Sequence, residues 1–145
     1  MGVTELLKKH RRIALDTNIF ISVFAQEAGG EKVLHLIEAA ADKGTHELMS
    51  SVLAFSECAV KPYRDGNWPA LDQVKLMFQM PNLTIYPMDG VVAEEAARLR
   101  ALYNCKMPDA IIVATAIVHN ADIFLTNDRR LTAIKEIPVI TVDEL

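Results

Sequence analysis

The stretch IALDTN at residues 13–18 joins a short apolar run to a carboxylate and then to the start of a helical pattern. Residues 13–15 are consecutive apolar residues, which indicate a buried strand, and residues 17–26 have helical character. Asp16 stands where the strand ends. Because open parallel sheets hold their ligands beyond the carboxyl ends of the strands, this junction indicates both the fold and the place of a site.

The alternation of a short apolar strand with a longer helix continues along the chain. Further strands are predicted at residues 46–50, 83–86, 123–125 and 139–141. Helices are predicted at residues 31–43, 51–60, 70–79, 89–103 and 107–119, with a short one at 128–135. This order predicts a three-layer α/β sandwich in which helices flank both faces of a mostly parallel sheet.

Length and composition favour one globular domain. The chain has 145 residues, 51% hydrophobic and 23% charged, so we expect a single domain at 1–145, in which residues 1–12 precede the first predicted strand. No apolar run reaches the ~20 residues of a membrane span, and no long apolar segment follows the charged N-terminus as in a secretory signal. Cys58 and Cys105 form no metal-binding pattern. We therefore expect a cytoplasmic protein with reduced cysteines and no membrane partner.

Four carboxylates stand out from this background. Asp16 and Asp128 follow predicted strands. Glu57 and Asp109 lie in strongly apolar segments and have no obvious Lys or Arg partner on their own helices. Taken singly, Asp16 and Asp128 could be N-caps and Asp109 a first-turn acid, while Glu57 could be a solvated residue at a helix edge. One acidic site at the carboxyl edge of the sheet accounts for all of them together.

Grouping four carboxylates requires a cation. Two like charges about 4 Å apart repel by roughly 4 kcal/mol at an effective dielectric constant of 20. All-oxygen ligands select hard ions, so Mg²⁺ or Mn²⁺ is expected, and zinc is disfavoured because the histidines are scattered. Such an ion lowers the pKa of bound water and stabilises phosphoryl charge, and a carboxylate can take a proton from that water. The sequence therefore predicts a metal-dependent enzyme that hydrolyses phosphodiester bonds.

Other proteins with acids at strand ends fit less well. A receiver-like domain would carry two adjacent acids on its first strand, but Leu15 precedes Asp16. A phosphatase of the DxD type would carry an acid where Asn18 stands. A non-catalytic binding module, which would be expected to have lost one or more of the four acids, remains the alternative to an enzyme. The pair Gly29 and Gly30 is expected to form a turn between helices, because no strand feeds it and no phosphate-loop motif follows.

Four segments in this order resemble the PIN domain family of ribonucleases. They lie at residues 15–18 (LDTN), 51–57 (SVLAFSE), 107–116 (MPDAIIVATA) and 124–131 (FLTNDRRL), and the resemblance spans about residues 13–145. It implies a parallel five-stranded sheet between helices, with a Mg²⁺ or Mn²⁺ site made by three or four acids. Carried over by position, Asp16 and Asp109 would be the principal metal ligands. Glu57 and Asp128 would complete the catalytic pocket, directly or through water.

The resemblance also implies supporting residues and partners. Thr126 would steady Asp128 or a bound water, and Asn18 would support the ligands from behind. Many single-domain members of this size are toxins of toxin–antitoxin pairs, endoribonucleases that act on structured RNA. The resemblance thus implies an RNA substrate, an antitoxin protein and a homodimer, with a standalone RNA-processing nuclease as the alternative. Trp68 could lie on a surface loop or in a dimer contact.

Basic residues near the acids have two interpretations. Arg129 and Arg130 could contact phosphates or be ordinary surface charges, and the same holds for Lys61 and Arg64. The formal net charge of −4 matches the four pocket acids alone, and a bound metal would offset much of that charge. The basic run at residues 8–12 is either the solvated end of an amphipathic helix or a phosphate-contacting arm.

Overall fold

One sheet, in which all neighbouring strands are parallel, forms the centre of the molecule. The computed structural model describes residues 2–145, apart from the side chain of Lys43. The strand order is β3-β2-β1-β4-β5, so the expected five-stranded parallel sheet is confirmed. The strands are β1 Arg12–Leu15, β2 Glu47–Ser51, β3 Leu83–Tyr86, β4 Ile123–Thr126 and β5 Val139–Thr141.

Helices fill the connections between the strands of the described chain. The α-helices are α1 Val3–Lys9, α2 Thr17–Phe24, α3 Gly30–Lys43, α4 Val52–Asp65, α5 Trp68–Met77, α6 Gly90–Tyr103 and α7 Met107–Val118. Two short 3-10 helices, η1 Arg129–Ala133 and η2 Val142–Glu144, flank β5.

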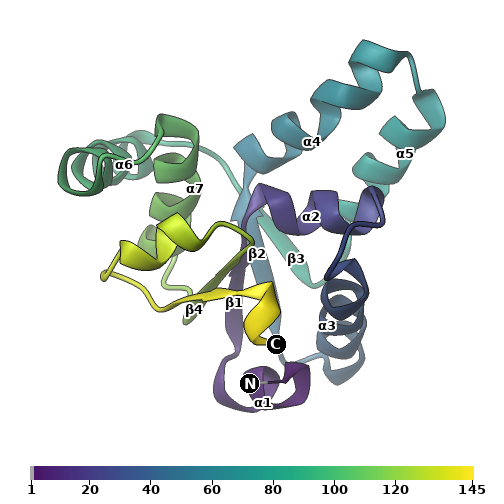
Figure 1. The fold of residues 1–145 in the computed structure, drawn as a ribbon, viewed down its shortest axis with the longest axis horizontal. Helices are drawn as coiled ribbons and strands as arrows, with labels where there is room; N and C mark the ends of the chain where they lie inside the picture. Colours follow the sequence, from purple (N-terminus) through teal and green to yellow (C-terminus); the bar gives the residue numbers. More distant parts are fainter. Residues whose placement is uncertain (1) are drawn as a thin grey trace.

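The helices cover both faces of the sheet, which gives the expected three-layer sandwich. α6 and α7 lie on one side of the strands, and α2 and α3 lie on the other (Figure 1). Residues 110–116 of α7 are all buried, as the continuous apolar sequence of this helix predicts. Within residues 2–145 no single helix is long and apolar enough to cross a membrane; α6 and α7 meet that test only as a pair bent by 120°.

The N-terminal residues form α1, an amphipathic helix. Val3, Leu6 and Leu7 are buried on one side of it, and Lys9 pairs with Glu5 at 2.9 Å on the exposed side. Of the basic run at residues 8–12, Lys8 and Lys9 form the solvated end of this helix, whose apolar side packs into the core, whereas Arg12 lies in β1 and pairs with Glu47.

Two helices differ from the sequence expectation. α4 does not stop before Pro62, where the missing proline amide usually ends a helix, but continues to Asp65. It ends at Gly66, whose φ of +62° lies in the left-handed region, and the amide of Asn67 donates to the carbonyl of Pro62 at 2.9 Å. The longer α4 forms a hairpin with α5 that projects from one end of the sheet (Figure 1).

The second difference lies between β4 and β5. A short α-helix is expected at residues 128–135, but the chain forms the 3-10 helix η1 and is extended again at Ile134. The amide of Leu131 donates to the carbonyl of Asp128 three residues earlier at 3.1 Å, and the amide of Ile134 donates to that of Leu131 in the same way, which is the hydrogen-bond pattern of a 3-10 helix.

Candidate active site

The predicted site residues gather at the carboxyl edge of the sheet, around the central strand β1. Strands β2 and β4 lie on opposite sides of β1, so the chain direction across the sheet reverses here. Open α/β sheets bind their ligands at such a switch point. Asp16 directly follows β1, and Asp128 lies just beyond the end of β4. Leu15 pairs with Leu125, which sets Asp16 level with Thr126.

Two helices bring Glu57 and Asp109 to the same edge. β2 leads into α4, which begins where the hydroxyl of Ser51 accepts a hydrogen bond from the amide of Leu53 at 3.1 Å. Glu57 lies in the second turn of this helix. α7 runs back toward the start of β4, so its first turn, which contains Asp109, lies at the carboxyl edge.

The four carboxylates interact through their charges, and we refer to them as the acid group (Asp16, Glu57, Asp109 and Asp128). Asp16 is only 3% exposed. Burial is the main cause that raises its pKa from 3.8 to about 6, and the charges of Asp109 and Glu57 raise it further. Burial also raises the pKa of Asp109, and the charge of Asp128 adds to that shift. Each acid is thus linked electrostatically to another member of the group.

Thr126 connects the ends of β1 and β4. Its hydroxyl donates a hydrogen bond to Oδ2 of Asp16 at 2.7 Å. Oγ1 of Thr126 also accepts from the amide of Asp128 at 3.0 Å and from Nδ2 of Asn18 at 3.4 Å. Asn18 in turn accepts from the amide of Asn127 at 3.0 Å. Thr126 therefore orients Asp16 as well as the backbone of Asp128, and Asn18 holds both strand ends together.

Thr17 contacts two of the predicted site residues, although it is not itself predicted as one from the sequence. Its hydroxyl donates to Oε1 of Glu57 at 2.6 Å, and its amide donates to Oδ1 of Asp16 at 2.8 Å. A buried threonine thus bridges two members of the acid group. The one sequence feature that points to Thr17 is its position directly after Asp16. The contact with Glu57 could not be predicted, because the two residues are far apart in sequence.

Asp128 pairs with a cation, Arg130, whereas the neighbouring cation Arg129 pairs with a different acid. Arg130 donates to Asp128 from Nε at 3.0 Å and from Nη2 at 2.8 Å, and this contact lowers the pKa of Asp128. Arg129 pairs with Asp143 instead. Asp128 also caps η1 by accepting from the amide of Arg130, so its capping role and its place in the acid group coexist. Phosphate contacts by Arg129 and Arg130 stay a prediction.

The acid group borders two separate cavities. Asp109 and Asp128 line one of about 270 Å³, together with Cys105, Lys106 and other residues of the α6–α7 turn and η1. Glu57 lines another of about 250 Å³ between α2, α4 and α5. These hollows leave both ends of the group open to a ligand.

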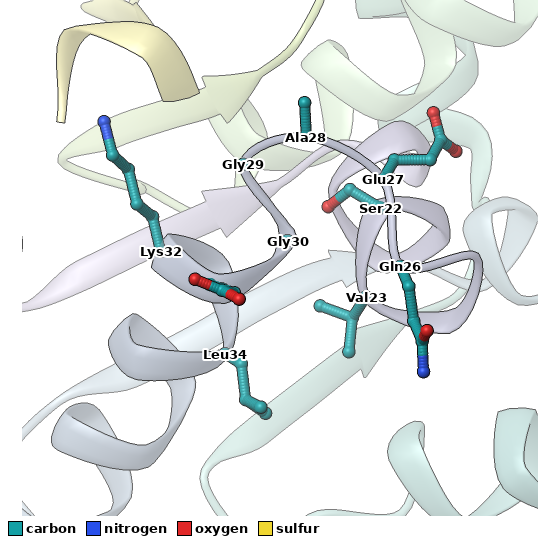
Figure 2. Close-up of a pocket in the computed structure, with 10 residues that line it drawn as sticks. Ser22, Val23, Gln26, Glu27, Ala28, Gly29, Gly30, Lys32 and Leu34 are labelled. Atoms are coloured by element: carbon teal, nitrogen blue, oxygen red, sulfur yellow. The ribbon is translucent and has the colours of Figure 1, made fainter.

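A larger cavity of about 690 Å³ lies elsewhere, at the turn between α2 and α3 (Figure 2). Gly29 has a φ of +88° there, and a Cβ on Gly30 would lie 2.4 Å from the carbonyl oxygen of Ser22, so both glycines serve the expected turn. The side chains of Glu27 and Lys32 point away from each other in Figure 2 and do not converge on one point. None of the four acids of the acid group lines this cavity.

The carboxylate chemistry fits a hard divalent cation, although the side chains are engaged with protein groups. Within residues 2–145, no three His, Cys, Asp or Glu side chains stand in a metal-ligating arrangement. Asp128 is turned onto Arg130, and Glu57 accepts from Thr17. The raised pKa of Asp16 indicates that its negative charge is poorly compensated by the protein alone. A cation with oxygen preference would supply that compensation.

The fold and the acid group define an α/β protein with an acidic edge at the switch point of a parallel sheet. A family model for the PIN domain matches residues 13–137, and the chain belongs to this family. A comparison with curated protein sequences gives no significant match.

Solved structures with the same fold include toxin–antitoxin assemblies. The toxin–antitoxin complex from Klebsiella pneumoniae has a chain with 22% identity and a TM-score of 0.67, over 90% of this chain and 97% of that one. A chain of VapBC2 from Rickettsia felis, bound to a DNA fragment from its promoter, has 16% identity and a TM-score of 0.74, over 90% of this chain and 98% of that one. A chain of DNA-bound VapBC from Salmonella typhimurium has 17% identity and a TM-score of 0.65, with the same two coverages of 90% and 98%. At these identities the likeness establishes the fold.

Proposed function

We propose that this PIN domain protein is a Mg²⁺- or Mn²⁺-dependent endoribonuclease that hydrolyses RNA phosphodiester bonds at the acid group. The observation that carries the proposal is the buried carboxylate of Asp16, which has a pKa raised to about 6 and lies at the switch point among three further acids. A carboxylate kept in such an unfavourable place is typical of a functional site. Its environment favours a cation that the described protein groups do not provide.

Asp16 and Asp109 would hold the divalent ion, and Glu57 and Asp128 would complete its surroundings directly or through water. When bound, the ion supplies a water of lowered pKa and neutralises charge on the phosphate. A carboxylate of the acid group takes the proton from the attacking water. Thr126 and Asn18 keep Asp16 in one orientation, which is the role of residues behind a metal ligand.

We further infer that the protein acts as the toxin of a toxin–antitoxin pair, with an antitoxin as its inhibitor and a homodimer as its assembly. Support comes from the structures with the same fold, which include complexes described as toxin–antitoxin, VapBC and FitAB assemblies. The match covers almost the whole of each of these chains, so the comparison concerns a module of the same size.

Cleavage of a labelled, structured RNA tests the proposed function. Wild type is expected to cut in Mg²⁺ or Mn²⁺ and to stop cutting in EDTA. Asp109→Asn and Glu57→Gln should each reduce the rate by roughly 10²-fold or more, because the ion loses a ligand or its support. Asp72→Asn is the matched control, since Asp72 is an exposed acid on α5 outside the acid group. Cleavage that persists in EDTA, or that both site variants retain, would refute the proposal.

Arg130→Ala is expected to strengthen Mn²⁺ binding about 2- to 5-fold. The guanidinium occupies both oxygens of Asp128 at the exposed end of the acid group, and the loss of an exposed ion pair changes an affinity only modestly. Its removal frees the carboxylate for the ion and raises the pKa of Asp128. Titration with Mn²⁺, followed by electron paramagnetic resonance, measures the affinity. Arg129→Ala is the control, because Arg129 pairs with Asp143 outside the acid group. Equal affinities in all three proteins would contradict this competition.

A further inference from the structure

The α4–α5 hairpin carries an exposed aromatic pair at its tip. Tyr63 and Trp68 are 57% and 58% exposed, although both are large rings. Their centroids lie 6.1 Å apart with an interplanar angle of 77°, an edge-to-face arrangement. In such a pair at least one ring keeps its faces uncovered, so a third flat ring can stack on it. We refer to these two residues as the aromatic tip.

Two cations without ion-pair partners lie on the same helix as Tyr63. Among the described residues, neither Lys61 nor Arg64 forms a salt bridge, and both are exposed. They follow Glu57 at helix spacings of i+4 and i+7, so the three share one side of α4. This side runs from the acid group toward the C-terminal end of α4, where the aromatic tip lies; Tyr63 itself lies roughly 120° around the helix axis from Glu57. Asp65 is the one acid in this part of α4.

We propose that the aromatic tip stacks on unpaired bases of single-stranded RNA, while Lys61 and Arg64 contact the phosphates between the tip and the acid group. This inference rests on the proposed function, because it names the part of the substrate that this arm holds. Aromatic rings beside a basic track are how proteins bind single strands without strong sequence preference. Tyr63 lies six residues beyond Glu57, which is about 9 Å along the helix at 1.5 Å per residue, or some three stacked nucleotides at ~3.4 Å each.

A second copy of this chain is the less favourable occupant of the same surface. In a two-fold contact centred on the aromatic tip, Lys61 and Arg64 would face their own copies, and like charges would approach each other. An RNA strand instead brings a negative charge to each cation and a flat base to each ring. Charge complementarity therefore selects the nucleic acid.

Trp68 is the only tryptophan in the chain, so its fluorescence reports on the aromatic tip alone. In EDTA, which prevents cleavage, a single-stranded oligoadenylate is expected to quench this fluorescence in wild type, and the matching RNA duplex is expected to quench it much less. Quenching that is equal for both RNAs, or absent while the single strand binds, would overturn the proposal.

Binding of the same fluorescein-labelled strand, followed by anisotropy, tests the residues separately. Tyr63→Ala and Trp68→Ala are each expected to bind roughly 5- to 100-fold more weakly, as for the loss of one stacked base, and Trp68→Phe should lose less. Leu76→Ala is the matched control, because Leu76 is an exposed apolar residue on α5 of the same hairpin. Circular dichroism melts exclude unfolding as the cause. Aromatic variants that bind like Leu76→Ala would overturn the proposal.

The salt dependence of RNA binding tests the proposed phosphate contacts of Lys61 and Arg64. Arg64→Ala should reduce the salt dependence of binding by about 0.7 in the slope of log K against log salt, the value for one phosphate contact on a single strand. Lys8→Ala is the control, because α1 lies at the other end of the molecule from the hairpin (Figure 1). An equal change in both variants would point to net charge and overturn the proposed track.

Other outcomes separate this inference from the proposed function. If wild type cuts RNA only with metal but the aromatic variants bind normally, the inference fails and the function stands. Loss of metal-dependent cleavage in wild type itself would instead remove the function. Trp68 quenching that rises with protein concentration without RNA, together with a shift to dimer in sedimentation, would assign the aromatic tip to a second copy and overturn the inference.

Discussion

Asp16→Asn is expected to abolish metal-dependent RNA cleavage and, in the absence of metal, to stabilise the protein at neutral pH. The variant removes a proposed metal ligand, which should lower the rate by about 10²-fold or more. It also removes a buried charge whose pKa is raised from 3.8 to about 6. That shift corresponds to ~3 kcal/mol at ~1.4 kcal/mol per pKa unit, so a gain of about 1–3 kcal/mol in unfolding free energy is expected at pH 7.

The same shift predicts how the stability of the metal-free protein depends on pH. An acid whose pKa is higher in the folded state binds protons more strongly there, so its contribution is fully present below about pH 3.8 and is lost as the pH rises through about 6. Denaturant unfolding in EDTA between pH 4 and 7.5 measures this loss in wild type. Asp16→Asn should lack it, and Asp72→Asn should retain it. An Asp16→Asn variant that is less stable than wild type at pH 7 would contradict the assignment of an uncompensated buried charge.

Thr126→Val is expected to lower the cleavage rate by roughly 10- to 100-fold and to destabilise the fold by about 1–3 kcal/mol. Valine has the shape of threonine but cannot donate to Asp16 or accept from the amide of Asp128. The loss of the donated hydrogen bond raises the pKa of Asp16 further, because that bond favours the charged carboxylate. Cleavage rates and denaturant unfolding in parallel measure both effects.

Thr115→Val is the matched control for this substitution. Thr115 is equally buried, but its hydroxyl donates only to the carbonyl of Ile111 one turn earlier in α7. The same chemical change there should cost less than about 1 kcal/mol and leave cleavage unchanged. If the two valine variants cleave RNA at the same rate, Thr126 has no special role in orienting Asp16.

The strands and the positions of the four acids can be predicted from the sequence for a physical reason. A parallel strand buried on both faces is a continuous apolar run, so β1 and β4 are visible as residues 13–15 and 123–125, and each run leads to an aspartate. Because parallel strands share one carboxyl edge, the topology brings Asp16 and Asp128 to the same place. The helical positions of Glu57 and Asp109 follow from the same alternation.

The side chains that form hydrogen bonds with those acids cannot be predicted in this way. Glu57 accepts from Thr17 and Asp128 is held by Arg130, and both contacts depend on side-chain rotamers. The extension of α4 past Pro62 cannot be predicted either. The local sequence favours a helix that ends before the proline, whereas the folded helix continues to Asp65 and packs against α5. The aromatic tip forms only because α4 extends past Pro62. The sequence alone therefore does not predict that Trp68 packs against Tyr63.

Direct titration with Mn²⁺ tests the central claim, that the acid group is a divalent-metal site, without depending on the choice of RNA. Electron paramagnetic resonance of free Mn²⁺ at pH 7.5 would be recorded for wild type, Asp16→Asn, Asp109→Asn and the control Asp72→Asn. We predict saturable binding in wild type and in Asp72→Asn, with at least a tenfold loss of affinity in each of the two site variants. Wild type that binds no Mn²⁺, or site variants that bind it as well as wild type, would contradict the account.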